Sequence, residues 1–256
     1  MGTSMSDTSL SMSADDAAPE LNPHLDRAQL AQTFARTGRV QIASVLTDAS
    51  ARRVHYALER ETPWGLILNE GKNVREFETV SAADYQAMAI AAWGRAPSGF
   101  QYFYHYYRLF ENRTIYPKSG HYLAKLVAFL TAPDFFAFVR EVTGLDSIAW
   151  ISSTATLYKP LDFLTVHDDG LAGGKLVAYV LNMTPKWQPD WGGALQFFDR
   201  DDHIEEGYLP TFNALNLFRV PKRHSVSQVA AFGGLRYSVS GWFGSDRPDR
   251  VSAAAP

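Results

Sequence analysis

The sequence predicts an α+β protein, mainly β with helical support, whose core is a jelly roll or sandwich of short strands. Two observations predict this class. From Ile148 onward, short β-forming runs are separated by glycine-containing turns, with no helical pattern between them. Before Ile148, several segments carry apolar residues at helical spacing. We expect these helices to pack on one outer face of the strands.

The first half of the chain is expected to be mostly helical. Thr47 is a suitable N-cap for a helix that runs to about Glu61, because its hydroxyl can accept a hydrogen bond from a free backbone N–H of the first turn. A short strand is predicted at Val40–Ile42. The other predicted helices are Leu25–Ala35, Ala82–Trp93, Tyr122–Leu130 and Pro133–Val142.

The segment Phe100–Tyr107 interrupts the helical half and is aromatic on both faces of a strand. It is typical of a buried strand of a sheet, and an aromatic wall beside a substrate site is the alternative. Trp64 and the acidic loop Asp199–Glu206 are further candidates for substrate recognition, although each of these features is more often structural.

Six short strands are predicted in the second half. They are Ala149–Leu157, Leu176–Met183, Ala194–Phe198, Ala214–Val220, Ser225–Val229 and Leu235–Phe243. Turn signals separate them at Gly173-Gly174, Asp190–Gly193 and Gly233-Gly234. The largely apolar run Leu176–Met183 indicates a strand buried on both faces, which would form part of a pocket floor.

We expect one domain over residues 22–247, with the jelly-roll core at about residues 148–243. Residues 1–21 are rich in Ser, Ala and Asp and predict a disordered tail, and residues 248–256 predict a flexible C-terminal tail.

Composition excludes several classes of function. A net charge of -3 and a pI of about 6.2 leave no basic surface for nucleic acid or an anionic membrane. No apolar run approaches the roughly 20 residues that span a membrane. The sequence has no cysteine, so disulfides, thiolate metal sites and cysteine nucleophiles are excluded. We expect a cytoplasmic protein.

A candidate metal site begins at His167-Asp168-Asp169. Successive side chains of a strand point to opposite faces, so His167 and Asp169 would share a face. A second imidazole would complete a 2-His-1-carboxylate triad, which suits non-haem Fe(II) and leaves coordination positions open. A His-x-Asp pair alone is a weak signal.

His224 is the favoured third ligand among the remaining histidines. It opens a predicted strand after a tight turn and can therefore lean into the mouth of a barrel. The others are less well placed: His24 lies near the predicted tail, His55 in a helix, His105 and His121 before the strand-rich half, and His203 in the acidic loop.

Arg236 is the other residue that carries chemistry. In a strand, Arg236, Ser238, Ser240 and Trp242 lie on one face. A buried guanidinium needs a partner, and its planar fork binds a carboxylate through two hydrogen bonds. A structural Arg–Asp pair is the alternative. Beside a two-histidine, one-aspartate set, a co-substrate that bears a carboxylate is the better explanation.

With these residues in place, Ala155–Phe243 resembles the Fe(II)/2-oxoglutarate-dependent dioxygenases, in particular their prolyl-hydroxylase-like branch. The resemblance covers about a third of the chain. It rests on Tyr158, His167–Asp169, Val177–Leu181, Trp187 to Gly193, Pro210 with Asn213, Leu217-Phe218, His224–Val226 and Arg236–Trp242.

The resemblance implies a double-stranded β-helix in which His167, Asp169 and His224 hold iron. It implies that Arg236 binds the distal carboxylate of 2-oxoglutarate, with help from Tyr158 and Ser240, and that Leu195 and Trp242 line the same pocket. Asn182 stands where many relatives have a tyrosine, so one hydrogen bond to the co-substrate would change.

The activity implied by the resemblance is hydroxylation of an unactivated C–H bond, with O₂ consumed, succinate and CO₂ formed and ascorbate as an accessory reductant. The substrate it suggests is a prolyl residue of a peptide or protein. A free amino acid or a secondary metabolite is an alternative substrate. A cupin-like enzyme that does not use 2-oxoglutarate and a jelly-roll binding module with a vestigial metal site are alternative functions.

Overall fold

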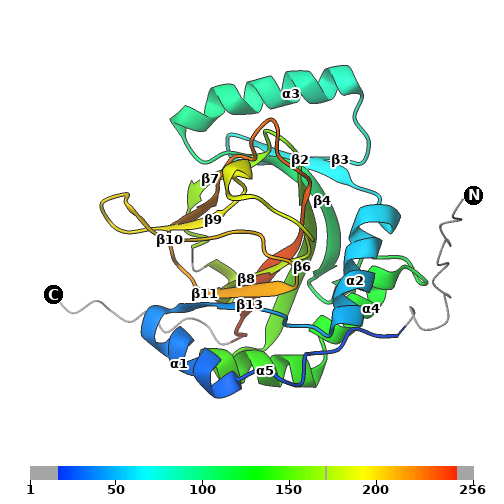
Figure 1. Cartoon of the computed structure of the whole chain (residues 1–256). Coiled ribbons are helices and arrows are strands. Elements are labelled where there is room, and N and C mark those ends of the chain that lie inside the picture. Colours follow the sequence, from blue (N-terminus) through cyan, green and yellow to red (C-terminus); the bar gives the residue numbers. More distant parts are fainter. Residues whose placement is uncertain (1–16, 171, 247–256) are drawn as a thin grey trace, which may run out of the picture.

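The computed structural model describes residues 17–170 and 172–246, and it shows a rolled antiparallel sheet with helices around it (Figure 1). The strands follow the order β1-β11-β8-β13-β6-β4-β7-β12-β9-β10, and β2 and β3 extend the sheet from β4. Strand β4 pairs with β6 along one part of its length and with β7 along another, which joins the two layers of the roll. The predicted fold class, mainly β with helical support, is confirmed.

The strands have the following bounds: β1 Arg39–Ile42, β2 Gly65–Glu70, β3 Asn73–Phe77, β4 Tyr102–Glu111, β5 Thr114–Ile115, β6 Trp150–Tyr158, β7 Phe163–His167, β8 Lys175–Asn182, β9 Leu195–Phe198, β10 Ile204–Tyr208, β11 Ala214–Arg219, β12 His224–Val226 and β13 Arg236–Gly244. All six strands predicted in the second half are present, as is the aromatic strand β4. Strands β2, β3, β5 and β10 were not predicted, and β7 was expected only as a strand without bounds that carries His167.

The helices are α1 Arg27–Thr37, α2 Asp48–Tyr56, which continues as a π-helical turn at Ala57–Glu61, α3 Ala82–Arg95, α4 Tyr122–Leu130 and α5 Pro133–Thr143. The predicted helices are therefore confirmed, with bounds shifted by a few residues. Thr47 caps α2 as expected, since its hydroxyl accepts from the backbone N–H of Ser50. Ser81 caps α3 in the same way.

The main hydrophobic core lies between four helices and the outer face of the larger layer. Helices α1 and α5 pack against each other below the sheet in Figure 1, and α2 and α4 lie beside it. Val239 and Phe243 of β13 face this core, together with Phe138 and Val139 of α5. The opposite face of β13 is thereby left to the interior of the roll.

Helix α3 departs from the prediction that all helices cover one outer face. It lies across the other end of the molecule, near β2 and β3 (Figure 1). Its Ala89 and Ala92 form a second core with Leu66, Leu68 and Phe103 of strands β2 and β4. The extra hairpin β2–β3 widens the sheet and gives α3 a separate surface to cover.

The N-terminal boundary also differs from the prediction. Residues 17–21, assigned to the tail, contact the domain: Leu21 pairs with Leu46, and the carbonyl of Ala17 accepts from the hydroxyl of Tyr122 at 3.0 Å. The rest of the predicted tail, residues 1–16, lies outside the described residues, as does the predicted tail at residues 248–256. The count of one domain stays a prediction.

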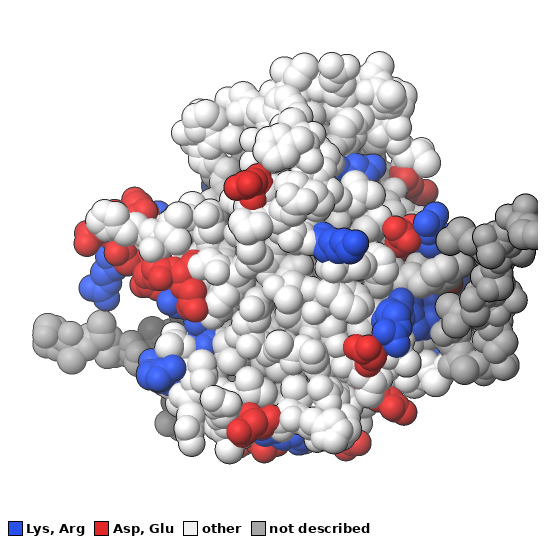
Figure 2. Space-filling model, viewed as in Figure 1, with Lys and Arg blue, Asp and Glu red and all other residues white. Residues whose placement is uncertain are grey.

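The acidic segment is a β-hairpin rather than a loop. Ile204–Tyr208 pairs with β9, and Figure 2 shows the acidic side chains gathered over this hairpin. Glu205 pairs with Arg39 at 2.9 Å and with Lys222 at 2.6 Å. These ion pairs fasten the hairpin to its neighbours, so the structural interpretation of this segment is favoured.

Within the described part of the chain, no single helix is both long and apolar enough to cross a membrane. Helices α4 and α5 pass the test of length and composition only as a pair bent by 52°.

Replacing Phe138 with alanine should lower the free energy of unfolding by about 3–5 kcal/mol, because its ring is fully buried in the main core and the change leaves a cavity. Urea denaturation measures this difference. Phe232→Ala is the matched control, since that ring is 71% exposed and its loss should change stability by less than about 0.5 kcal/mol. Equal effects of the two substitutions would contradict the described core.

Candidate active site

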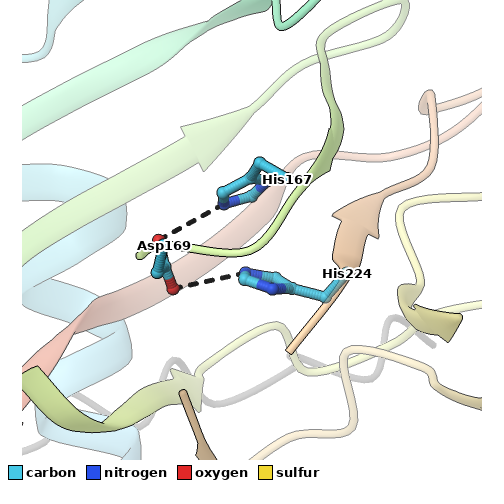
Figure 3. Close-up of side chains that lie close together, drawn as sticks. All are labelled: His167, Asp169 and His224. Carbon is cyan, nitrogen blue, oxygen red and sulfur yellow. Dashed lines mark ion pairs between the residues drawn. The ribbon is translucent and has the colours of Figure 1, made fainter. Parts of the chain in front are cut away.

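Three side chains converge inside the roll: His167 at the end of β7, Asp169 in the turn that follows, and His224 at the start of β12 (Figure 3). Nε2 of His167 lies 3.4 Å from Oδ1 of Asp169, and Nε2 of His224 lies 3.5 Å from Oδ2. The ligand atoms of all three lie within 4.8 Å of one another. Among the described residues, no other group of three or more His, Cys, Asp or Glu side chains is arranged to hold a metal ion.

The convergence of the two histidines depends on an irregularity in the pairing of β7 with β12. Val226 pairs with Leu164, so in a regular antiparallel ladder His224 would face Val166. It pairs instead with His167, which means that β7 contains one extra residue, as in a β-bulge. The bulge turns His167 to the inner face of the sheet, where His224 lies.

The backbone conformation that places Asp169 in the site is not the strand that was predicted. Strand β7 ends at His167, and Asp169 has a φ of 66°, in the left-handed region that non-glycine residues rarely adopt. The carboxylate of Asp168 accepts from the backbone N–H of Gly170 at 3.0 Å and so stabilises this turn. His167 and Asp169 do lie together, but strand alternation is not the reason. Strained backbone of this kind is often found at functional sites.

Both imidazoles are oriented by backbone carbonyls. Nδ1 of His167 lies 3.0 Å from the carbonyl of Thr165, and Nδ1 of His224 lies 2.7 Å from the carbonyl of Lys222. Because a carbonyl only accepts, each Nδ1 carries the proton in the neutral ring, which leaves the lone pair of Nε2 directed at Asp169. This is the tautomer that a metal ligand requires.

The charges in the site also suit a cation. Burial lowers the pKa of His224 to about 4, and the charge of His167 lowers it further, so His224 is neutral near pH 7. Burial alone would raise the pKa of Asp169, but the hydrogen bond that a protonated His167 donates and the charges of protonated His224 and His167 outweigh it and lower this pKa to about 2. A neutral imidazole and an ionised carboxylate are the forms that bind metal.

The other described histidines lie outside this group. His203 is 81% exposed and pairs with Asp199, as its place in the acidic segment suggested. His55 lies in α2 and His121 caps α4. His105 was placed before the strand-rich half, but it belongs to β4 in the middle of the sheet, where Nδ1 lies 3.5 Å from the buried Asp162.

A cavity of about 340 Å³ contains the three converging side chains and runs along the inner face of the larger layer. Eight of the nine predicted site residues line it: His167, Asp169, His224, Arg236, Tyr158, Ser240, Leu195 and Trp242. Asn182, the ninth, is fully buried and lies against Arg236. The structure therefore brings the whole predicted set to one place.

Arg236 is a buried cation without an acidic partner among the described residues. It is 2% exposed, and burial lowers its pKa. Nη1 donates to Oγ of Ser238 at 3.1 Å, Nη2 lies 3.5 Å from Oδ1 of Asn182, and the guanidinium faces the ring of Tyr158 at 5.1 Å. These partners are neutral, so the expected structural Arg–Asp pair is absent from the described residues.

Two buried donors at this end of the cavity lack a hydrogen-bond partner among the described residues: Nε of Arg236 and Nδ2 of Asn182. An unpaired buried donor costs about 1–3 kcal/mol, and more if it is charged. A carboxylate beside Arg236 would neutralise the guanidinium and offer acceptors to donors at this end of the cavity. The residues therefore fit a ligand with a carboxylate at this end and a metal at the other.

Tyr104 lies in the site, although it was expected only as part of the candidate aromatic wall Phe100–Tyr107 and not as a site residue. Its ring stacks on that of Tyr158, with centroids 4.8 Å apart and planes at 20°. Tyr102, Tyr104 and Tyr106 alternate along β4 and all line the cavity, whereas His105 lies on the other face. The period of two within the aromatic segment was the signal that could have identified them. The segment is both a buried strand and an aromatic wall.

Comparison with known proteins gives the same picture. Residues 153–244 match the model of the 2OG-Fe(II) oxygenase superfamily. The mouse protein "Prolyl 3-hydroxylase OGFOD1" is 35% identical over 117 residues, which are 43% of this chain and 21% of that protein. The chain thus aligns with about a fifth of this relative.

Two solved structures share the fold. One is a 2OG-Fe(II) oxygenase family protein from Burkholderia pseudomallei, with a TM-score of 0.60 at 13% identity. The match covers 91% of this chain and all of the Burkholderia chain. The other is a prolyl hydroxylase from Trichoplax adhaerens in complex with a hypoxia inducible factor peptide fragment, with a TM-score of 0.57 at 14% identity. The match covers 86% of this chain and 89% of the Trichoplax chain.

The rolled sheet has the jelly-roll fold of these solved structures, and residues 153–244, which contain the triad and Arg236, match the 2OG-Fe(II) oxygenase superfamily. Within that class, the sequence relatives from mouse and Xenopus laevis are named prolyl 3-hydroxylases, and the chain is similar to that branch. The resemblance described from the sequence is confirmed.

Proposed function

We propose that the protein is an Fe(II)- and 2-oxoglutarate-dependent oxygenase that hydroxylates a prolyl residue of a peptide or protein. The observation that carries this proposal is the pairing of two features in one cavity. A metal-ligand triad lies in it, and a buried arginine without an acidic partner among the described residues lies beside the triad. Arg236 argues against a cupin-like enzyme or a binding module, because neither needs a carboxylate anchor.

Each residue has a defined role in this proposal. His167, Asp169 and His224 hold Fe(II). Arg236 and Asn182 donate to the distal carboxylate of 2-oxoglutarate, in place of a tyrosine at position 182. Tyr158, Ser240, Leu195 and Trp242 surround the co-substrate.

When bound, Fe(II) with 2-oxoglutarate and O₂ supplies the oxidising chemistry that hydroxylates a C–H bond, with succinate and CO₂ released and ascorbate as an accessory reductant. The protein fixes the geometry and keeps water out. Burial of Arg236 strengthens its interaction with the co-substrate carboxylate because little water screens it.

Support for a prolyl substrate comes from the relatives. The mouse relative is named a prolyl 3-hydroxylase, and the Trichoplax structure holds a peptide. Prolyl hydroxylation is the activity named for those proteins, and we propose the same activity for this chain. A cytoplasmic location is proposed with it, on the composition of the sequence.

An anaerobic titration of the Fe(II)-loaded protein with 2-oxoglutarate tests the cofactor pair. We expect a saturable visible absorption band from charge transfer between metal and ligand, because the co-substrate binds next to the ion. The His167→Ala protein should show no band. Metal binding without a band would favour the cupin-like enzyme, and no metal binding would favour the binding module.

A further inference from the structure

The cavity extends well beyond the triad and Arg236. On the far side of the metal ligands it is lined by Ile67 of β2 and by Val74 and Glu76 of β3. Along β4 it continues from Tyr102 to Arg108 and ends at Glu111. None of these side chains has a role in holding metal or co-substrate in the proposed function, so this part of the cavity is free for the substrate.

An aromatic wall, formed by Phe100, Tyr102, Tyr104 and Tyr106, connects the two parts of the cavity. The ring of Phe100 contacts that of His167 at 5.0 Å and that of Tyr102 at 5.6 Å, and Tyr102 contacts Tyr104 at 5.6 Å. A flat apolar surface of this kind packs well against a prolyl ring. The wall therefore leads from a metal ligand towards the outer end of the cavity.

Tyr104 lies on this wall between the two ends of the cavity. Its ring contacts that of Tyr102 at 5.6 Å and stacks at 4.8 Å on that of Tyr158, which Arg236 faces. A substrate that lies on the wall would therefore pass Tyr104.

The outer end carries a surplus of negative charge. Arg108 donates to Oε2 of Glu111 at 2.6 Å and also pairs with Oε1 of Glu76. The other oxygen of Glu76 accepts from the hydroxyl of Tyr106 at 2.9 Å. One guanidinium therefore neutralises two carboxylates only in part. The three charged side chains are 30–45% exposed, so an incoming group can reach them.

We infer that the substrate is an extended peptide in which a lysine or arginine binds at Glu76 and Glu111 while the reacting residue lies beside the triad. Tyr104 and Arg108 are four residues apart on β4, or about 13 Å at about 3.3 Å per residue. A free amino acid cannot span that distance. An extended peptide with a long cationic side chain spans it when about two to four residues separate the two positions. This inference rests on the proposed function and adds the class of substrate.

Fluorescence anisotropy of labelled peptides tests the inference on the full chain, loaded with Fe(II) and 2-oxoglutarate without oxygen. Each peptide has one central proline in a neutral background, with a single Lys, Gln or Glu at each position up to four residues away on either side. We expect Lys two to four residues from the proline, on one side only, to tighten binding about two- to fivefold over Gln, and Glu to weaken it. The preference should fade at high salt.

Glu111→Gln should remove the preference for Lys, and Glu78→Gln should keep it. Glu78 is the matched control because it is exposed and follows the same hairpin but does not line the cavity. The charge-transfer band should be unchanged in both variants, which shows that the site is intact.

Three results would overturn the inference: equal binding of the Lys and Gln peptides, tightest binding of the Glu peptide, or binding of no peptide. The first would show that charge is not recognised, the second that Arg108 is the recognition group, and the third that the substrate is not a peptide. The first two leave the proposed function standing if the charge-transfer band is present, whereas the third leaves only its Fe(II) and 2-oxoglutarate part standing. Absence of the band is instead a failure of the proposed function.

Discussion

Replacing Arg236 with methionine should stabilise the ligand-free protein and at the same time abolish most of its affinity for 2-oxoglutarate. The guanidinium is 2% exposed, and no described carboxylate neutralises it. Replacing buried ionic groups with apolar ones of similar volume is often stabilising by about 1–4 kcal/mol. We expect a gain of this size in the unfolding free energy of the apo protein, measured by urea denaturation.

The loss of affinity in the same variant should be at least about thirtyfold, since removal of one member of a buried charge pair costs about 2 kcal/mol or more. Isothermal titration of the metal-loaded protein with 2-oxoglutarate measures it, and metal binding itself should be nearly unchanged. Arg223→Met is the control: its side chain is 44% exposed and pairs with Asp202, so neither quantity should move appreciably. A destabilised Arg236→Met protein with normal co-substrate affinity would show that Arg236 is structural.

Replacing His224 with alanine should lower the affinity for divalent metal more than about a hundredfold. Removing a group that only supports a metal ligand already costs about 10–100-fold, and His224 is proposed as a ligand itself. Anaerobic titration with Fe(II), or with Mn(II) as a stable probe, measures the change. His203→Ala should bind metal like the wild type, because His203 is 81% exposed and lies in the β9–β10 hairpin.

The outcome that would refute this assignment is a larger loss in His203→Ala than in His224→Ala. Circular dichroism of both variants shows whether the fold is retained. His224 is 5% exposed, so a stability measurement belongs beside the metal titration, and saturation at high metal concentration would show that the variant is folded.

Much of the fold could be predicted because local patterns and tertiary contacts agree. Tyr122–Leu130 and Pro133–Thr143 have apolar residues at helical spacing, the second also begins with a proline, and both helices form as expected. The hairpin Gly65–Phe77 was not predicted because β3 is exposed almost throughout and lacks the apolar alternation of a half-buried strand. The position of α3 depends on that hairpin and could not be inferred without it.

The membership of the site could be predicted better than its geometry. The types of residue at 167, 169, 224 and 236 are those that the chemistry requires, and all four line one cavity. The placement of the metal ligands depends on the bulge in β7 and on the left-handed backbone of Asp169. No local sequence pattern predicted either feature. Tyr104 was missed because an aromatic strand without a known neighbour does not show which of its faces meets the metal.

The bulge has a consequence for how the chain tolerates change. Because the side chains of a strand alternate, a chain of the same length that paired β7 with β12 without the bulge would set Val166 opposite His224 and send the imidazole of His167 to the opposite side. Every metal ligand would still be present in such a chain, yet the site would be gone. Preserving this site therefore requires the bulge in the five-residue strand β7 to be kept as strictly as the identity of its last residue.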